Sequence, residues 1–166
     1  MTSDGSSRPK LDDLLMDLRV ERSKLETLVE GLRVACRSLD QDSLPPLRVD
    51  AVALRLQSSY TGIECCFVLI VRAINGAPPD GADWHRRLLD RMTVASPARP
   101  ALLRADTAQG LVERLRFRPV VRHLYAYELE AEQVERLLGK VLGLWPEVSS
   151  DLDQFTAWLL ELFEAL

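Results

Sequence analysis

A leucine recurs every seven residues in the first quarter of the chain, and this repeat constrains the fold more than any other feature. The repeated residues are Leu11, Leu18, Leu25, Leu32 and Leu39, with Leu14 and Leu28 in the second apolar position of the heptad. Apolar residues at this spacing form one stripe along an α-helix, which another helix must cover. The repeat therefore predicts a long helix over about residues 10–39. A helical bundle is favoured over a coiled coil, because the rest of the chain offers partner helices.

Further helices, separated by turn-rich stretches, account for the rest of the chain. Pro45 and Pro46 stop the first helix, because proline lacks the amide hydrogen of the helical ladder. Helical patterns then cover about residues 48–74, 83–93, 106–129 and 130–165. The expected inward residues of the second helix are Val49, Val52, Leu56, Tyr60, Ile63, Phe67, Ile70 and Ile74. Since no strand pattern and no glycine-rich phosphate loop occurs in the sequence, the predicted fold is all-α. It is an up-and-down bundle of four long helices plus one short helix.

Small polar residues mark where the predicted helices begin. Side chains of Ser, Thr, Asp and Asn can accept hydrogen bonds from the first amides of a helix. Residues of this kind at the expected helix starts are Asp83, Asp106 or Thr107, and Ser149 or Ser150. Pro146 lies inside the last segment and is expected to kink or split it, so that one of the two serines would cap a second half.

Length and composition predict one ordinary globular domain. Of the 166 residues, 47% are hydrophobic and 28% are charged, and we expect a polar tail over residues 1–9 and one helical domain over residues 10–166. The net charge of −4 argues against a general electrostatic attraction to nucleic acid. The sequence has no apolar run of membrane-spanning length, so no membrane association is expected. Because the first residues also lack the apolar stretch of a signal peptide, the expected location is the cytoplasm.

Cysteine and histidine are too few and too scattered for a zinc site. The chain has three cysteines and two histidines, His85 and His123, without the spacing of zinc ligands. Adjacent Cys65 and Cys66 fall in an apolar run and are expected to be buried, reduced thiols. We expect no bound cofactor, and any catalysis should need no protein-bound metal ion.

The segment RFRPVVRHLYAYEL, residues 116–129, concentrates polar chemistry in a leucine-rich chain. The imidazole of His123 can exchange a proton near neutral pH, and the guanidinium of Arg118 can hold a phosphate. Tyr125 can donate a hydrogen bond or stack on a base. A straight helix separates Arg118 and His123 by about 140° around its axis. Either a kink at Pro119 or a second copy of the helix across a two-fold axis would bring them together.

Arg118, His123 and Tyr125 read as R-x4-H-x-Y, which resembles the signature of HEPN-domain ribonucleases and in particular of HepT toxins. The surrounding sequence is similar to a HepT-like subfamily as well. The stretches that carry this similarity are YTGIE (60–64), INGAPPDGADWHRRLLDRM (74–92), RP (99–100), FRPVVRHLYAYEL (117–129) and LWPEV (144–148). The resemblance extends from about residue 11 to residue 162.

The resemblance implies a HEPN-type homodimer whose paired motifs line a basic groove that cuts RNA without a metal ion. It implies that Arg118 holds the scissile phosphate, that His123 transfers protons and that Tyr125 contacts RNA. Further candidate RNA contacts are Arg114, Arg116 and Arg122, and Arg116 is also a reserve candidate for the phosphate role. The implied partner is an MntA-type nucleotidyltransferase antitoxin that attaches AMP to Tyr125. The added nucleotide would be bulky and anionic and would occupy the RNA groove.

Pro119 departs from the pattern of many HEPN ribonucleases, which carry a polar residue, often Asn or His, after the motif arginine. The departure puts the catalytic rate in doubt more than the fold. One alternative is therefore a non-catalytic HEPN protein that serves as the binding subunit of a nucleotidyltransferase. A purely structural dimerisation module is a third alternative.

Other polar residues favour structural roles. His85, beside Trp84, is interpreted as a packing residue at the helix start, not as a catalytic one. Glu64 is surrounded by apolar residues and is expected to pair with an arginine, Arg72 or Arg122, instead of acting as a base. A second basic cluster consists of Arg86, Arg87 and Arg91. It could belong to a surface that binds RNA or the antitoxin, and a solvated helix face explains it equally well.

Overall fold

The computed structural model describes residues 7–39, 44–115 and 130–166 of the chain. Its helices are α1 (Ser7–Ser38), α2 (Pro46–Ile70), η1 (Val71–Asn75), α3 (Trp84–Met92), α4 (Ala105–Leu115) and α6 (Ala131–Glu164). The residues described contain no strand, so the predicted all-α fold is confirmed. Among the described helices, none combines the length and the apolar character that crossing a membrane requires.

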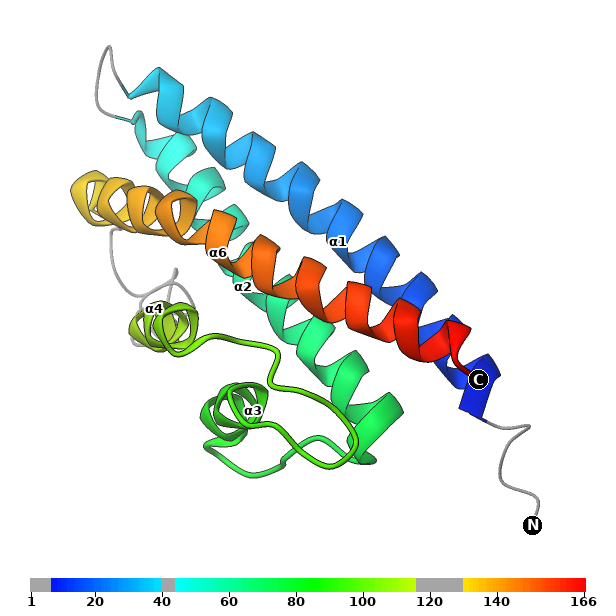
Figure 1. The fold of residues 1–166 in the computed structure, drawn as a ribbon. Coiled ribbons are helices and arrows are strands. Elements are labelled where there is room, and N and C mark those ends of the chain that lie inside the picture. Colours follow the sequence, from blue (N-terminus) through cyan, green and yellow to red (C-terminus); the bar gives the residue numbers. More distant parts are fainter. Residues whose placement is uncertain (1–6, 40–43, 116–129) are drawn as a thin grey trace.

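Three long helices form the body of the molecule (Figure 1). Helix α1 runs antiparallel to α2 and α6 and packs against both. The short helices α3 and α4 lie on the side of α2 and α6 that is opposite α1. Helix α3 contacts α2, and α4 contacts α6. The C-terminus lies at the same end of the bundle as the start of α1. The predicted bundle of long helices with one short helix is recognisable, and of the long helix expected over about residues 106–129 the described residues include α4, which ends at Leu115.

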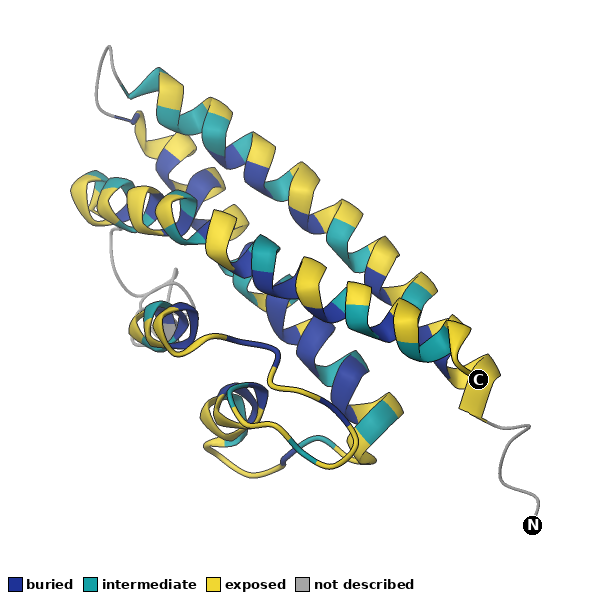
Figure 2. Cartoon of the chain, viewed as in Figure 1, coloured by how far each residue is buried: buried dark blue, intermediate teal, exposed yellow. Residues whose placement is uncertain are grey.

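The apolar stripe of α1 follows the predicted leucines with two exceptions, Leu28 and Leu39, of which Leu39 is half-buried and lies after the end of the helix. Its buried residues are Leu11, Leu14, Leu18, Leu25, Val29 and Leu32. Leu28 is only half-buried, and Val29 takes the inward position. A strict seven-residue repeat drifts by about 20° per heptad on a straight helix, so one position must change to keep the stripe facing the core. Figure 2 shows buried residues of α1 on its inner side and exposed ones on its outer side.

Helix α2 begins with Pro46 in its first turn, where the missing amide hydrogen costs no hydrogen bond. Six of the eight predicted inward residues are buried, whereas Tyr60 and Ile74 are half-buried. The α-helix ends at Ile70 and continues as one wider turn, η1. This turn places Val71 in the core and ends at Gly76, whose positive φ of 97° suits glycine.

The predicted split at Pro146 does not occur, because α6 is one continuous helix of 34 residues. Pro146 is exposed, and its neighbours Trp145 and Val148 are buried. The packing of Trp145 and Val148 keeps the chain helical at Pro146, although a proline in a helix interior costs about 3 kcal/mol. The two serines after the proline cap nothing: the Ser149 carbonyl and hydroxyl accept hydrogen bonds from α1, and the Ser150 hydroxyl accepts one from Gln154.

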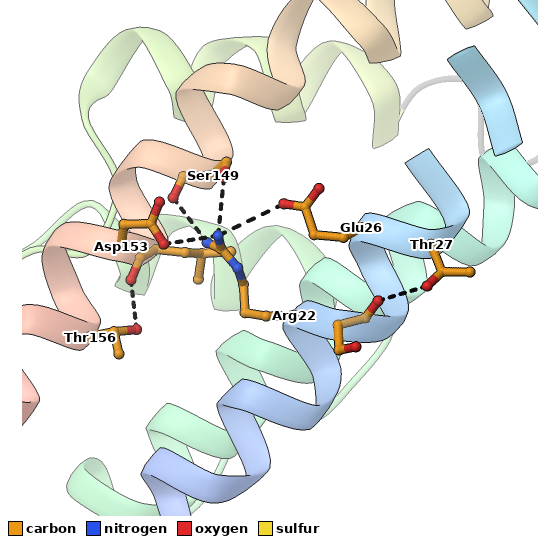
Figure 3. Close-up of polar contacts among 8 residues, drawn as sticks. Arg22, Glu26, Thr27, Ser149, Asp153 and Thr156 are labelled. Carbon is orange, nitrogen blue, oxygen red and sulfur yellow. Dashed lines mark hydrogen bonds and ion pairs between the residues drawn. The ribbon is translucent and has the colours of Figure 1, made fainter. Parts of the chain in front are cut away.

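Arg22 makes the contact between α1 and Ser149 (Figure 3). Its Nη1 donates to the Ser149 carbonyl at 2.9 Å and its Nη2 donates to the Ser149 hydroxyl at 3.1 Å. The Asp153 carboxylate lies 2.8 Å from the same Nη2. One half-buried guanidinium therefore ties α1 to α6 across the bundle.

Asp83 stands at the N-cap position of α3, as predicted, but its side chain makes no capping hydrogen bond. The caps predicted for α4 are wrong. Helix α4 begins at Ala105, ahead of both predicted caps. Thr107 is fully buried within the first turn, and its hydroxyl has no hydrogen-bond partner among the residues described. The amide before this helix, that of Arg104, donates instead to the carboxylate of Asp151 in α6, at 3.0 Å.

The cysteines differ from one another in exposure. Cys66 is buried, Cys36 is half-buried and Cys65 is exposed, so the prediction of a buried thiol at Cys65 is wrong. Neighbouring residues of a helix point about 100° apart, and only one of an adjacent pair can face the core squarely. Burial raises the pKa of the Cys66 thiol to about 12.

Candidate functional site

The motif residues lie in the segment 116–129, which is outside the described residues. This applies to Arg116, Arg118, Arg122, His123 and Tyr125. The description of α4 ends at Leu115, immediately before the segment, and Glu130 precedes α6 directly after it. The convergence of His123 and Arg118, and the pairing of two protomers around them, therefore stay predictions. Arg114 is the one candidate RNA contact whose surroundings can be described.

Arg114 is a buried cation near the end of α4. Its side chain is buried, with 9% of the residue exposed, and its Nη2 donates to the main-chain carbonyl of Lys140 in α6 at 2.6 Å. Burial lowers the pKa of Arg114 to about 10, while the nearby Tyr60 phenol raises it. The guanidinium is therefore still charged at neutral pH. It belongs to the boundary between α4 and α6, not to a solvated basic face.

Glu64 and His85 form a polar pair between α2 and α3. Oε1 of the buried Glu64 lies 2.5 Å from Nδ1 of His85, and the two rings of His85 and Trp84 are in contact, with centroids 3.5 Å apart. The prediction that Glu64 pairs with Arg72 is wrong, since Arg72 is exposed and the Glu64 carboxylate contacts the His85 ring. The part of that prediction that concerns Arg122 falls outside the described residues. His85 is a packing residue, as predicted, although it joins two helices instead of capping one.

The carboxylate–imidazole pair has a clear structural consequence. A buried carboxylate needs a hydrogen-bonding or charged partner, and His85 provides it. The two residues are 21 positions apart, and no local pattern in the sequence pairs them.

The second basic cluster holds a loop in place. Arg87 donates to the Asp80 carbonyl at 3.2 Å and Arg91 donates to the Ala77 carbonyl at 3.1 Å, so both brace the turn-rich stretch before α3. Arg86 is exposed and pairs with Asp90 one turn along the same helix. These contacts favour the interpretation of a solvated face, on which two of the arginines also stabilise the loop before α3.

Arg99 belongs to the RP stretch (99–100) of the family resemblance, and its structural role was not predicted. Its buried guanidinium donates to the Asn75 side chain at 2.8 Å and to the carbonyls of Arg91, Val94 and Pro100. Burial lowers the pKa of this guanidinium. The four acceptors hold the loop between α3 and α4 against the end of η1. Across the described part of the chain, no group of three or more His, Cys, Asp or Glu side chains is arranged to hold a metal ion.

One comparison with known proteins gives a match. Residues 51–159 match the model of a family described as HepT-like protein. The matched range begins in α2, contains α3, α4 and the segment 116–129, and ends in α6, which is about two-thirds of the chain. No match is found among curated proteins or among solved structures.

Proposed function

Because the chain belongs to the HepT-like protein family, we propose that it is a metal-independent endoribonuclease toxin of a toxin–antitoxin pair. The observation that carries the proposal is the spacing of Arg118, His123 and Tyr125 within the matched range. The family supports a toxin-type HEPN protein, and the intact motif supports catalysis by it. The protein would act in the cytoplasm, where both RNA and an antitoxin are present.

The proposed reaction uses the 2′-hydroxyl of RNA as its nucleophile. His123 accepts the proton of this hydroxyl as its oxygen bonds to the adjacent phosphorus, and the bond from phosphorus to the 5′-oxygen breaks. The departing 5′-oxygen takes a proton, which His123 of the partner subunit can donate, and a 2′,3′-cyclic phosphate remains. Arg118 stabilises the charge that develops on the phosphate oxygens. A homodimer supplies the acid and the base as two copies of one residue.

Control of the toxin is proposed to act through Tyr125. An MntA-type nucleotidyltransferase antitoxin would transfer AMP from a nucleoside triphosphate to the Tyr125 hydroxyl and release pyrophosphate. The attached phosphate would pair with the neighbouring arginines, and the adenosine would occupy space that RNA needs. Intact mass spectrometry of protein co-expressed with the antitoxin tests this step, because each AMP adds one fixed mass increment. Loss of the increment in Tyr125→Phe supports the assignment, and its persistence at another residue overturns it.

Growth after induction tests the nuclease proposal in cells. Wild type is expected to arrest growth, whereas His123→Ala and Arg118→Ala are expected to be harmless at equal expression. Arg19→Ala is a matched control, because Arg19 is an exposed arginine of α1 that is not part of the motif, and its removal should leave the arrest intact. Arrest that persists unchanged in His123→Ala would contradict the proposal.

Pro119 favours a second candidate, a non-catalytic binding subunit of a nucleotidyltransferase. A proline beside the motif arginine removes a polar side chain at that position and stiffens the backbone. This candidate predicts harmless wild-type expression together with tight binding of the transferase. Pull-down with the transferase, combined with the growth assay, separates the two functions.

A further inference from the structure

A groove of about 350 Å³ lies between α1 and α2, which run side by side in opposite directions (Figure 1). Lys24 and Leu28 line it from α1, and Leu54, Ser58 and Thr61 line it from α2. We call it the α1–α2 groove. It is an open furrow along two helices, so its shape suits another helix better than a small molecule, which needs a more enclosed site.

Helix α2 has few charged residues for a helix with an exposed side. From Leu56 to Ile70 its one charged residue is Glu64, which is buried. The side towards the groove is nevertheless open: Leu54 is 57% exposed, and Thr61 and Cys65, seven and eleven residues further along, are exposed as well. The exposed side of a helix normally carries charged side chains, and a helix that lacks them on every side is typically surrounded by protein. This side of α2 therefore has the character of a covered surface.

The α1 side of the groove adds no net charge at its centre. Glu21 and Lys24 both line it, and they pair with each other, with Lys24 Nζ 2.7 Å from Glu21 Oε1. Beneath them Leu25 packs directly on the main chain of Gly62, since a Cβ atom at Gly62 would lie 2.6 Å from the Leu25 side chain. Protein interfaces have a centre with few charges and a polar rim. The centre of the α1–α2 groove fits this pattern.

Unlike charges stand on the two sides of this centre. The Arg55 guanidinium lies over Gly31, and Leu25 lies over Gly62, so these two contacts fix how α1 and α2 are aligned. Arg55 is seven residues from Gly62 in one direction along the groove, which is about 10 Å. Asp17 is eight residues from Leu25 in the opposite direction, which is about 12 Å. Both side chains are exposed.

This arrangement of charges is complementary to itself. A two-fold axis through the contact of Leu25 with Gly62 would place Arg55 of each copy level with Asp17 of the partner subunit. The uncharged centres would then face each other, and opposite charges would meet at both ends. An unrelated protein would have to supply the same pattern of charges at the same spacing, whereas a second copy of this chain has it already.

We propose that the α1–α2 groove is an interface between two copies of this chain, with an ion pair between Arg55 and Asp17 of the partner subunit at each end. The proposal goes beyond the proposed function and does not depend on it, because the residues that carry it lie outside the segment 116–129. A contact through paired motifs would be a second interface. With both interfaces the assembly would contain more than two subunits.

Reversal of the charges tests this pairing. Arg55→Asp places a carboxylate opposite Asp17 of the partner subunit, and Asp17→Arg places a guanidinium opposite Arg55 of the partner subunit. Each substitution should raise the Kd of self-association by about tenfold or more, because a two-fold interface contains the pair twice. The double variant restores opposite charges and should return the Kd to within about threefold of wild type. Sedimentation equilibrium of the full chain over a dilution series measures these constants.

Arg19→Asp is the matched control for a change of charge on α1. Arg19 is exposed and points about 160° away from Asp17 around the helix, so the Kd should stay near wild type. Arg55→Gln and Asp17→Asn remove a charge without reversing it and should give intermediate values. Circular dichroism checks that every variant is folded.

Weaker association in both single reversals, with recovery in the double variant, supports the interface. A wild type that stays monomeric at every concentration overturns it, as does an unchanged Kd in either single reversal. A double variant that associates as weakly as the single ones also overturns the pairing. If the single reversals keep their mass but bind the nucleotidyltransferase less tightly, the groove belongs to that partner and the proposal is overturned. None of these measurements uses cleavage of RNA, so the nuclease proposal stands or fails separately.

Discussion

Asp151→Ala is predicted to destabilise the protein strongly, because Asp151 anchors the start of α4. This residue of α6 is buried, with 2% of it exposed, and its two oxygens accept hydrogen bonds from Arg104, the residue directly before α4. Oδ2 accepts from the main-chain amide of Arg104 at 3.0 Å, and Oδ1 accepts from the Nε of its guanidinium at 2.5 Å. A carboxylate at this place also faces the positive end of the helix dipole of α4.

The expected loss of stability follows from these contacts. A hydrogen bond to a charged group contributes about 1.5–3 kcal/mol. The main-chain contact should contribute fully, because its acceptor is buried. The side-chain contact counts for less, since 56% of the Arg104 side chain is exposed and solvent screens it. Asp151→Ala should therefore lower the free energy of unfolding by about 2–3 kcal/mol, which corresponds to about 5–10 °C in Tm for a chain of this length.

Urea unfolding followed by circular dichroism measures this change. Asp153→Ala is the matched control: it lies two residues further along α6, its side chain is 67% exposed, and its ion pair with Arg22 should contribute at most about 1 kcal/mol. The two variants should differ clearly in their urea midpoints, with similar slopes. Equal loss of stability in both variants would refute the assignment of Asp151 as the anchor of α4.

The remaining predictions concern the buried Cys66 and two glycines, Gly143 and Gly62. Because burial raises the pKa of the Cys66 thiol from 9.0 to about 12, unfolding releases a proton between these values, so stability should fall as the pH rises through this window. Cys66→Ala should flatten the fall in pH-dependent unfolding curves, and an unchanged curve would contradict the assignment. Gly143→Ala should stabilise α6 by up to about 1 kcal/mol, since its Cβ meets open space. Gly62→Ala should destabilise by about 1–3 kcal/mol, since its Cβ would lie 2.6 Å from the fully buried Leu25, and the reverse order of Tm values would be inconsistent with the packing.

The helices could be predicted from the sequence because their signals are local. In α1 and α2 the apolar residues recur at helical spacing, and this spacing alone predicts which face of each helix is buried. The inward shift from Leu28 to Val29 could not be read from the repeat, because it depends on how straight the helix runs. The split predicted at Pro146 does not occur for a related reason. The burial of Trp145 and Val148 outweighs the local tendency of proline to break the helix.

The polar contacts could not be predicted, because they join residues far apart in the chain. Glu64 meets His85 across two helices, and the start of α4 is held by Asp151 instead of by its own Asp106 or Thr107. The same limit applies to Arg114, whose burial comes from α6 and not from its basic neighbours. The motif chemistry stays a prediction, which rests on residue types at a fixed spacing. Its geometry lies outside the described residues.

Cleavage of RNA by the purified protein in the presence of EDTA tests the central claim most directly. The preparation should first be shown by intact mass to carry no AMP. Wild type is then expected to cut unmodified RNA and leave 2′,3′-cyclic phosphate ends, while RNA with methylated 2′-hydroxyls stays whole and His123→Ala is inactive. If unmodified wild type leaves RNA as intact as His123→Ala does, or if both cut it equally, the claim that His123 and Arg118 form a ribonuclease site is contradicted.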